Sequence, residues 1–217
     1  MQHTLTGKRV LITQADEFMG PALCEVFAEQ GAEVVASTAD LAPPEAAAQV
    51  VAQAVKDAGP IDVLVANLAY RAPTTPAVEV DEDEWRGVFA ALVDPLPRLV
   101  RAAAPAMIQR RSGKVLVVGS ASALRGMKRT STYSAARGAQ LAYVQAVGVE
   151  LAPHQVQVNA IAQNFGKRVP NTLLTRVSSQ TSTTGRRSAN ATRQVVPSPG
   201  SMVAVRWLMR TTVPTTV

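Results

Sequence analysis

Three side chains, Ser120, Tyr133 and Arg137, have the types and the spacing from which acid–base chemistry can be built. Tyr133 and Arg137 are four residues apart, so they share one face of a helix if one forms there. A phenol is a poor base at neutral pH, because its reference pKa is about 10, and a nearby guanidinium stabilises the ionised form. We therefore expect Tyr133 to act as a general base, Arg137 to supply the stabilising charge, and Ser120 to orient a substrate oxygen.

Short apolar runs alternate with longer amphipathic stretches around these residues. This alternation predicts an α/β fold, a Rossmann-like doubly wound parallel sheet in a single domain. Because such sheets bind ligands at the carboxyl ends of their strands, Ser120 is predicted to lie where a ligand binds. The longest predicted helix contains Pro95 and Pro97, which should bend or restart it. The predicted strands are residues 8–13, 32–37, 61–66, 114–119 and 156–161, and the predicted helices are residues 18–30, 45–58, 83–109 and 133–151.

The composition excludes several classes of function. Cys24 is the single cysteine, and His3 and His154 are the two histidines, so neither a disulfide framework nor a cysteine or histidine metal site is expected. No apolar run reaches the roughly 18 residues of a membrane-spanning helix, and the N-terminus lacks the apolar region of a secretion signal. We therefore predict a cytoplasmic protein without a bound metal and without a membrane partner.

The net charge of +6 is concentrated in the last quarter of the chain. Residues 166–217 contain eight Lys or Arg residues, sixteen Ser or Thr residues and no acid, so residues 1–165 carry a small excess of acids. No nucleic-acid-binding motif accompanies the basic segment, and nucleic acid is not expected as a partner. We predict a Rossmann-like catalytic domain over residues 1–165 and an atypical, basic, Ser/Thr/Arg-rich segment over residues 166–217.

The succession of Ser120, Tyr133 and a basic residue four positions later resembles the short-chain dehydrogenase/reductase superfamily, whose active site uses Ser, Tyr and Lys. Arg137 stands where that family has Lys. The loop after the first strand departs further, because residues 13–20 contain one glycine where those dehydrogenases carry three. Two acids of this loop would repel the phosphates of a dinucleotide, and Phe18 would occupy the space that the cofactor needs.

These departures together are similar to the halohydrin dehalogenase family. The pattern Thr13-x4-Phe18-x-Gly20, combined with the Ser, Tyr and Arg spacing, carries the resemblance, which covers residues 8–165. It implies a carbon–halide lyase without a cofactor, which closes a vicinal halohydrin to an epoxide and releases halide. In reverse, small anionic nucleophiles would open epoxides. The resemblance also implies a homotetramer formed through helix-to-helix contacts.

The resemblance implies roles for nine residues. Tyr133 would take the hydroxyl proton, Ser120 would hold the substrate oxygen, and Arg137 would support the ionised Tyr133. A halohydrin or an epoxide and its halide would be the small-molecule partners. The halide and substrate pocket would be lined by Thr13, Phe18, Gly20, Gln163, Asn164 and Phe165.

Two other functions stay open from the sequence. An NAD(P)-dependent short-chain dehydrogenase/reductase would require the missing glycines to be dispensable, whereas a non-catalytic Rossmann-like protein would release no halide.

The sequence after Phe165 also lacks the mixed-charge helices and the final strand of families with this fold. We hypothesise that residues 166–217 are poorly ordered or derive from a reading-frame change, which would leave the edge of the sheet unprotected.

Overall fold

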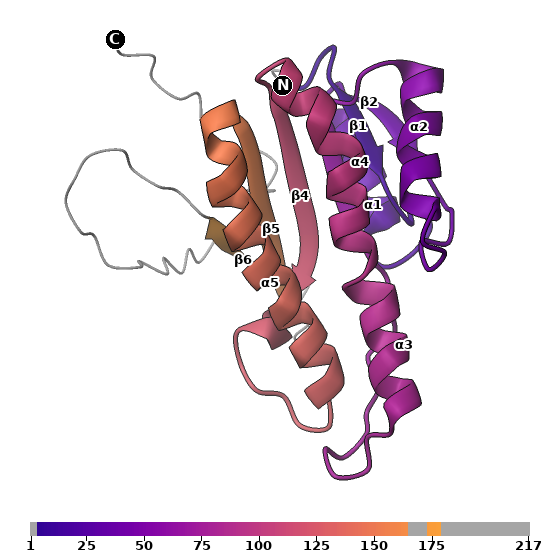
Figure 1. Cartoon of the computed structure of the whole chain (residues 1–217), viewed down its shortest axis with the longest axis vertical. Coiled ribbons are helices and arrows are strands. Elements are labelled where there is room, and N and C mark those ends of the chain that lie inside the picture. Colours follow the sequence, from indigo (N-terminus) through magenta and orange to yellow (C-terminus); the bar gives the residue numbers. More distant parts are fainter. Residues whose placement is uncertain (1–3, 165–172, 179–217) are drawn as a thin grey trace, which may run out of the picture.

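The computed structural model describes residues 4–164 and 173–178, which form one sheet with helices packed against it (Figure 1). The strands are β1 (Arg9–Ile12), β2 (Glu33–Ala36), β3 (Val63–Asn67), β4 (Gly113–Ser120), β5 (Val156–Asn164) and β6 (Leu173–Ser178). The helices are α1 (Gly20–Glu29), α2 (Ala46–Ala58), α3 (Glu82–Leu92), α4 (Pro95–Gln109) and α5 (Ser131–Leu151), with the short 3-10 helices η1 (Ala121–Ala123) and η2 (Ala152–His154).

The order of the strands across the sheet is β2-β1-β3-β4-β5-β6. Strands β1 to β5 are parallel, and β6 is antiparallel to β5. The chain turns from one side of β1 to the other after β2, so the strand order reverses between β1 and β3. Open α/β sheets bind ligands at such a reversal, at the carboxyl ends of the strands. The predicted Rossmann-like, doubly wound parallel sheet in a single domain is confirmed.

Alternate side chains of β1 enter two different cores, because successive residues of a strand point to opposite faces. Val10 and Ile12 pack on the face covered by α1, together with its Phe27. Leu11 belongs to the other core, where α2, α4 and α5 cover the sheet. Both faces of the central strands are therefore dry, as the continuous apolar runs of a parallel sheet require.

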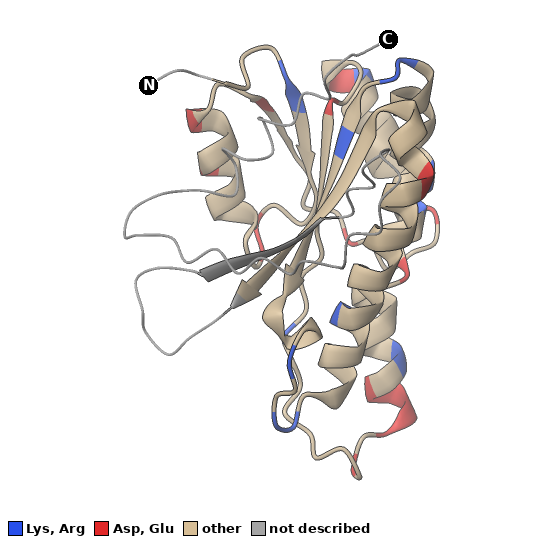
Figure 2. Cartoon of the chain, turned by 90° about the vertical axis from the view of Figure 1, so that its left-hand side faces the viewer, with Lys and Arg blue, Asp and Glu red and all other residues tan. Residues whose placement is uncertain are grey.

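The predicted helix over residues 83–109 is two helices. Asp81 caps the first, its side chain accepting a hydrogen bond of 2.8 Å from the backbone N–H of Glu84. The first turn of α3 contains Glu82, Asp83 and Glu84, and the ribbon of Figure 2 is coloured red for acidic residues there, at the lower end of the molecule. Acids at this end complement the helix dipole. The second helix restarts at Pro95, which tolerates this position because a first-turn N–H has no helical partner.

The edge of the sheet beyond β5 is not bare. Strand β6 pairs with Asn159–Asn164, so β6 and not β5 is the outermost strand of the described sheet. The remaining C-terminal residues, 165–172 and 179–217, lie outside the described part, as do residues 1–3. The boundary at residue 165 and the hypothesis of a reading-frame change remain predictions. None of the helices in the described ranges combines the length and the apolar composition needed to cross a bilayer.

Candidate functional site

The side chains of Tyr133 and Arg137 lie one turn apart near the start of α5, and both are buried. Three hydrogen bonds fix the guanidinium of Arg137. Its Nη1 donates to the carbonyl of Val118 on β4 and to Oε1 of Gln140, each at 3.0 Å, and its Nη2 donates to the carbonyl of Leu68 at 3.1 Å. Because these acceptors come from β4, α5 and the segment after β3, Arg137 ties together the elements that form the ligand edge of the sheet.

Arg137 is a fully buried cation, with 0% of its side chain exposed, and its three acceptors are neutral oxygens. Burial lowers the pKa of its guanidinium, whereas the neighbouring Tyr133 raises it. A buried charge without a counter-charge is costly, so a phenolate on Tyr133 would compensate Arg137 at this site. The sequence prediction that these two side chains interact agrees with this arrangement.

The guanidinium of Arg137 also contacts two aromatic rings. Its central carbon lies 5.0 Å from the centroid of the Tyr133 ring and 5.3 Å from the centroid of the Phe18 ring. A cation over an aromatic face is attracted by the ring quadrupole, most strongly where water is excluded. Phe18, from the loop between β1 and α1, therefore stands directly beside the Tyr133–Arg137 pair.

Ser120 ends β4 at the same edge of the sheet. Ser120 lies two positions after Val118, whose carbonyl accepts a hydrogen bond from Arg137. In the sheet, Ser120 is paired with Gln163 of β5. The Ser120 Oγ accepts hydrogen bonds from the backbone N–H and the hydroxyl of Ser122, at 3.2 and 3.0 Å. Both bonds use Ser120 as an acceptor, so its own O–H can be donated to a substrate oxygen.

Thr13 lies inside the sheet and joins two of its strands. It is 0% exposed, its hydroxyl donates to the carbonyl of Asn67 at 3.1 Å, and it accepts from the backbone N–H of Asn67 at 3.1 Å. The Asn67 amide in turn donates to the carbonyls of Gln14 at 2.8 Å and Glu17 at 3.0 Å. Thr13 and Asn67 thus hold the loop after β1 against the end of β3, and the hydroxyl of Thr13 is directed to the backbone and not to a pocket.

The loop after β1 adopts a backbone conformation that glycine favours, but without glycine. Gln14 and Phe18 have φ angles of 43° and 51°, in the left-handed region that other residues rarely occupy. The Gln14 side chain extends to the segment after β3, where its Oε1 accepts from the backbone N–H of Ala69 at 2.6 Å. The start of α1 requires glycine at position 20, because a Cβ there would lie 2.4 Å from the carbonyl oxygen of Ala15.

The predicted pocket residues of β5 are placed only in part. Gln163 is 2% exposed, and its Nε2 donates to the sulfur of Met19 at 2.8 Å, which brings it to the loop that carries Phe18. Its Oε1 is buried without a hydrogen-bond partner among the described residues. Asn164 is the last residue of β5, and Phe165 lies outside the described residues.

Three polar residues that support the site were missed from the sequence. Asn67 is the polar residue that ends the apolar run of β3, and that position was the available signal. Gln140 lies three residues after Arg137 on a buried helix face, where its amide donates to the carbonyl of Leu92. Glu84 accepts from the hydroxyls of Thr75 and Thr132, the latter at 2.9 Å, and so joins α3 to the start of α5 beside Tyr133.

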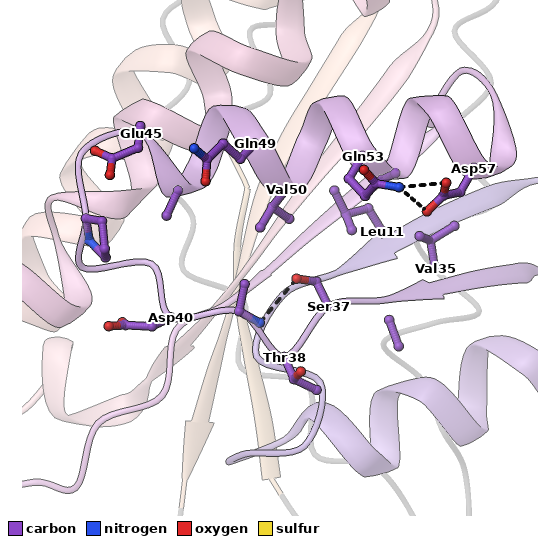
Figure 3. A pocket seen from close by; sticks show the side chains of 15 residues that line it. Leu11, Val35, Ser37, Thr38, Asp40, Glu45, Gln49, Val50, Gln53 and Asp57 are labelled. Atoms are coloured by element: carbon purple, nitrogen blue, oxygen red, sulfur yellow. Dashed lines mark hydrogen bonds between the residues drawn. The ribbon is translucent and has the colours of Figure 1, made fainter.

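A surface cavity of about 670 Å³ lies away from these residues, between the end of β2 and α2 (Figure 3). Asp40, Glu45 and Asp57 line it together with hydroxyl and amide groups. Gln53 donates to both carboxylate oxygens of Asp57, at 2.7 and 2.8 Å. The cavity lining contains neither Lys nor Arg, so it offers no cation to a phosphate group.

The loop between β1 and α1 does not fit the dinucleotide that the resemblance to dehydrogenases implies. A pyrophosphate needs backbone without side chains at the turn, and here Gln14 and Phe18 project side chains that are held by Ala69 and Arg137. Asp16 and Glu17 are exposed in the loop before α1 and add negative charge where phosphates would approach. Arg137 itself is buried and already bonded to carbonyl groups.

Comparisons with known proteins place the chain among dehydrogenases and reductases. The family model described as short chain dehydrogenase matches residues 4–168. The chain is 31% identical over 189 residues to 5-keto-D-gluconate 5-reductase of Escherichia coli (strain K12), covering 76% of this chain and 74% of that protein. It is 30% identical to sorbitol dehydrogenase of Cereibacter sphaeroides, covering 73% and 70%. A solved structure of a dehalogenation enzyme superimposes with a TM-score of 0.68 at 30% identity, covering 73% and 72%.

The expectation that this chain is a halohydrin dehalogenase is wrong. The family model and the curated relatives are dehydrogenases and reductases, and the likeness to one dehalogenation enzyme does not outweigh them. These findings favour the alternative that the sequence left open, an NAD(P)-dependent short-chain dehydrogenase/reductase. The assignment to the carbon–halide lyases falls with the dehalogenase interpretation, whereas the predicted small-molecule partners stay a prediction.

Proposed function

Because the chain belongs to the short-chain dehydrogenase/reductase family, we propose that it is an oxidoreductase that interconverts a hydroxyl and a carbonyl group on a small molecule. The observation that carries this proposal is the buried Tyr133–Arg137 pair at the carboxyl edge of the sheet. Arg137 is bonded to Val118 of β4, the strand that ends at Ser120. This edge is where open α/β sheets bind their ligands.

The proton of the reaction would pass through Tyr133. In the direction of reduction, the phenol donates its proton to the oxygen of the carbonyl group while the hydroxyl of Ser120 holds that oxygen. The phenolate left on Tyr133 is then stabilised by the guanidinium of Arg137, 5.0 Å from the ring. In the direction of oxidation, the phenolate takes the proton of the substrate hydroxyl.

The two-electron partner that this reaction uses in the family is a nicotinamide dinucleotide, which supplies or accepts a hydride. The substrate class follows from the relatives, which act on a keto-gluconate and on sorbitol. A small polyhydroxylated compound that carries a keto group, or a secondary hydroxyl that can be oxidised to one, is therefore the first candidate. We further propose that the chain is cytoplasmic and forms a homotetramer. Light scattering of the purified chain, which measures the mass of the assembly, tests the tetramer.

The test is a turnover assay with the purified chain, millimolar NADH or NADPH, and a panel of keto sugars and keto sugar acids, run also in reverse with polyols. Oxidation or formation of the reduced dinucleotide at 340 nm, dependent on the substrate, is the expected result. Matched assays with the Tyr133→Phe variant separate catalysis from contamination. Absence of turnover with every substrate, in a well-folded protein, would refute the proposal.

A further inference from the structure

We infer that Gln14 and Phe18 occupy the dinucleotide position of this chain from within, so that the chain binds NAD(P) weakly until these two side chains are displaced. The inference rests on the proposed function and adds to it a means by which the chain limits its own cofactor affinity.

The first observation is the backbone of the loop. Gln14 and Phe18 are two of the five described non-glycine residues with positive φ, and they lie four residues apart in one turn. The strained conformation allows a backbone to approach a ligand closely when the residue is glycine. Here the backbone has the same conformation, but Gln14 and Phe18 place side chains where a ligand would bind.

The second observation is that both side chains are held in place. Oε1 of Gln14 accepts from Ala69 N–H at 2.6 Å, which closes the gap between the loop after β1 and the segment after β3. The ring of Phe18 lies against the guanidinium of Arg137, 5.3 Å from its central carbon. The amide of Asn67 secures the backbone between them, because it bonds the carbonyls of both Gln14 and Glu17.

The third observation is the place in the fold that these contacts fill. β1 and β3 are neighbours in the sheet, and the strand order reverses between them. The loop after β1 and the segment after β3 are thus the two walls of the crevice in which a doubly wound sheet binds its ligand. Gln14 bridges these walls, and Phe18 reaches from one wall to the Tyr133–Arg137 pair.

Replacing both side chains by glycine keeps the backbone path and empties the crevice. The Gln14→Gly/Phe18→Gly variant should bind NADH or NADPH at least about tenfold more tightly than the unaltered chain, whose dissociation constant we expect above about 1 mM. Titration calorimetry of the purified chains with each dinucleotide measures this without any substrate. Circular dichroism and thermal unfolding establish that the variants are folded.

The chain offers a matched control at two other left-handed positions. Arg111 and Gln155 have φ angles of 51° and 59°. Arg111 lies two residues before β4 and Gln155 directly before β5, so both are at the amino edge of the sheet, away from the crevice. The Arg111→Gly/Gln155→Gly variant relaxes the backbone to a comparable extent but removes no side chain from the site. Its dinucleotide affinity should equal that of the unaltered chain. If the double glycine variant of the loop does not fold, Gln14→Ser/Phe18→Ala provides the same measurement.

Micromolar affinity of the unaltered chain, or an opened variant that binds no more tightly than the control, overturns the inference. Tight binding by the opened variant without turnover of any substrate would sustain the inference and refute the proposed oxidoreductase activity. The two proposals therefore fail in different experiments.

Discussion

The start of α5 and the loop between β1 and α1 meet at Arg137, but their side chains are arranged for different tasks. On α5, Tyr133 and Arg137 are buried one helical turn apart, and Arg137 is bonded to β4, to its own helix and to the segment after β3. In the loop, Gln14 and Phe18 bond to the protein itself and fill the position of a ligand.

The difference shows that the acid–base pair and the cofactor cradle of this fold have separate physical requirements. The pair needs two side chains one helical turn apart and a buried environment, which α5 and β4 supply together. A dinucleotide site in this fold needs a turn without side chains. In this chain, two positions of that turn with positive φ carry the side chains of Gln14 and Phe18. One region can therefore change while the other is retained.

The largest effect is expected where the pair itself is broken. Tyr133→Phe removes the proton donor, so we expect kcat/KM to fall by at least about 100-fold, as for loss of a general acid or base. Steady-state kinetics with the best substrate of the panel measure it. Tyr143→Phe, on the same helix but outside the site, is the control and should keep normal turnover. Near-normal activity of Tyr133→Phe would remove Tyr133 from the mechanism.

Arg137 should have the next largest effect. In Arg137→Met the buried positive charge beside Tyr133 is lost, so we expect kcat/KM to fall at least about tenfold. Arg137→Lys keeps a charge but cannot reproduce both carbonyl bonds, so an intermediate loss is expected. Steady-state kinetics of the two variants with the best substrate of the panel are the readout. Unchanged kcat/KM in Arg137→Met would show that the cation does not act on Tyr133.

Gln140 connects the pair to α3, and its loss should reduce stability more than chemistry. Gln140→Leu leaves Nη1 of Arg137 with one acceptor fewer and the buried carbonyl of Leu92 without its donor. We expect a loss of about 1–3 kcal/mol in the free energy of unfolding. Urea denaturation measures it, with the exposed Gln53→Leu on α2 as the control. A Gln140→Leu protein as stable as that control would contradict the role of this bond.

The smallest effect is expected at Glu84, which supports the start of α5 from outside the site. Glu84→Gln weakens the bonds to Thr75 and Thr132, so we expect a loss of about 0.5–1.5 kcal/mol in stability. Glu82→Gln, which loses only an exposed pair with Arg86, should change stability less. Thermal unfolding of the two variants distinguishes them, and equal stabilities would show that the Glu84 bonds are dispensable.

Much of the fold could be predicted because its signals are local. The apolar runs located β1 to β5 to within a few residues, and the prolines after Leu92 predicted the restart of the helix at Pro95. Strand β6 could not be predicted in the same way, because its pairing with β5 depends on a distant strand and its own sequence lacks a clear apolar alternation.

The predicted reaction is wrong, because it depends on a pattern that does not specify a reaction. The pattern at Thr13, Phe18 and Gly20 describes which side chains line a turn. Side chains that exclude one ligand do not specify the chemistry of the neighbouring pair. The buried oxygens that hold Arg137 were also invisible, because the carbonyls of Leu68 and Val118 belong to the backbone and every residue has one.

The sequence by itself determined that Tyr133 and Arg137 share a helical face and that Ser120 ends a buried strand, because helix periodicity and apolar runs need no distant partner. Only the tertiary structure decided that Arg137 is buried against the rings of Tyr133 and Phe18, and that Gln14 bonds across to Ala69. Those contacts join segments far apart in the chain. They depend on the register of β1, β3 and β4 and on two left-handed backbone angles that the residue types alone would not favour.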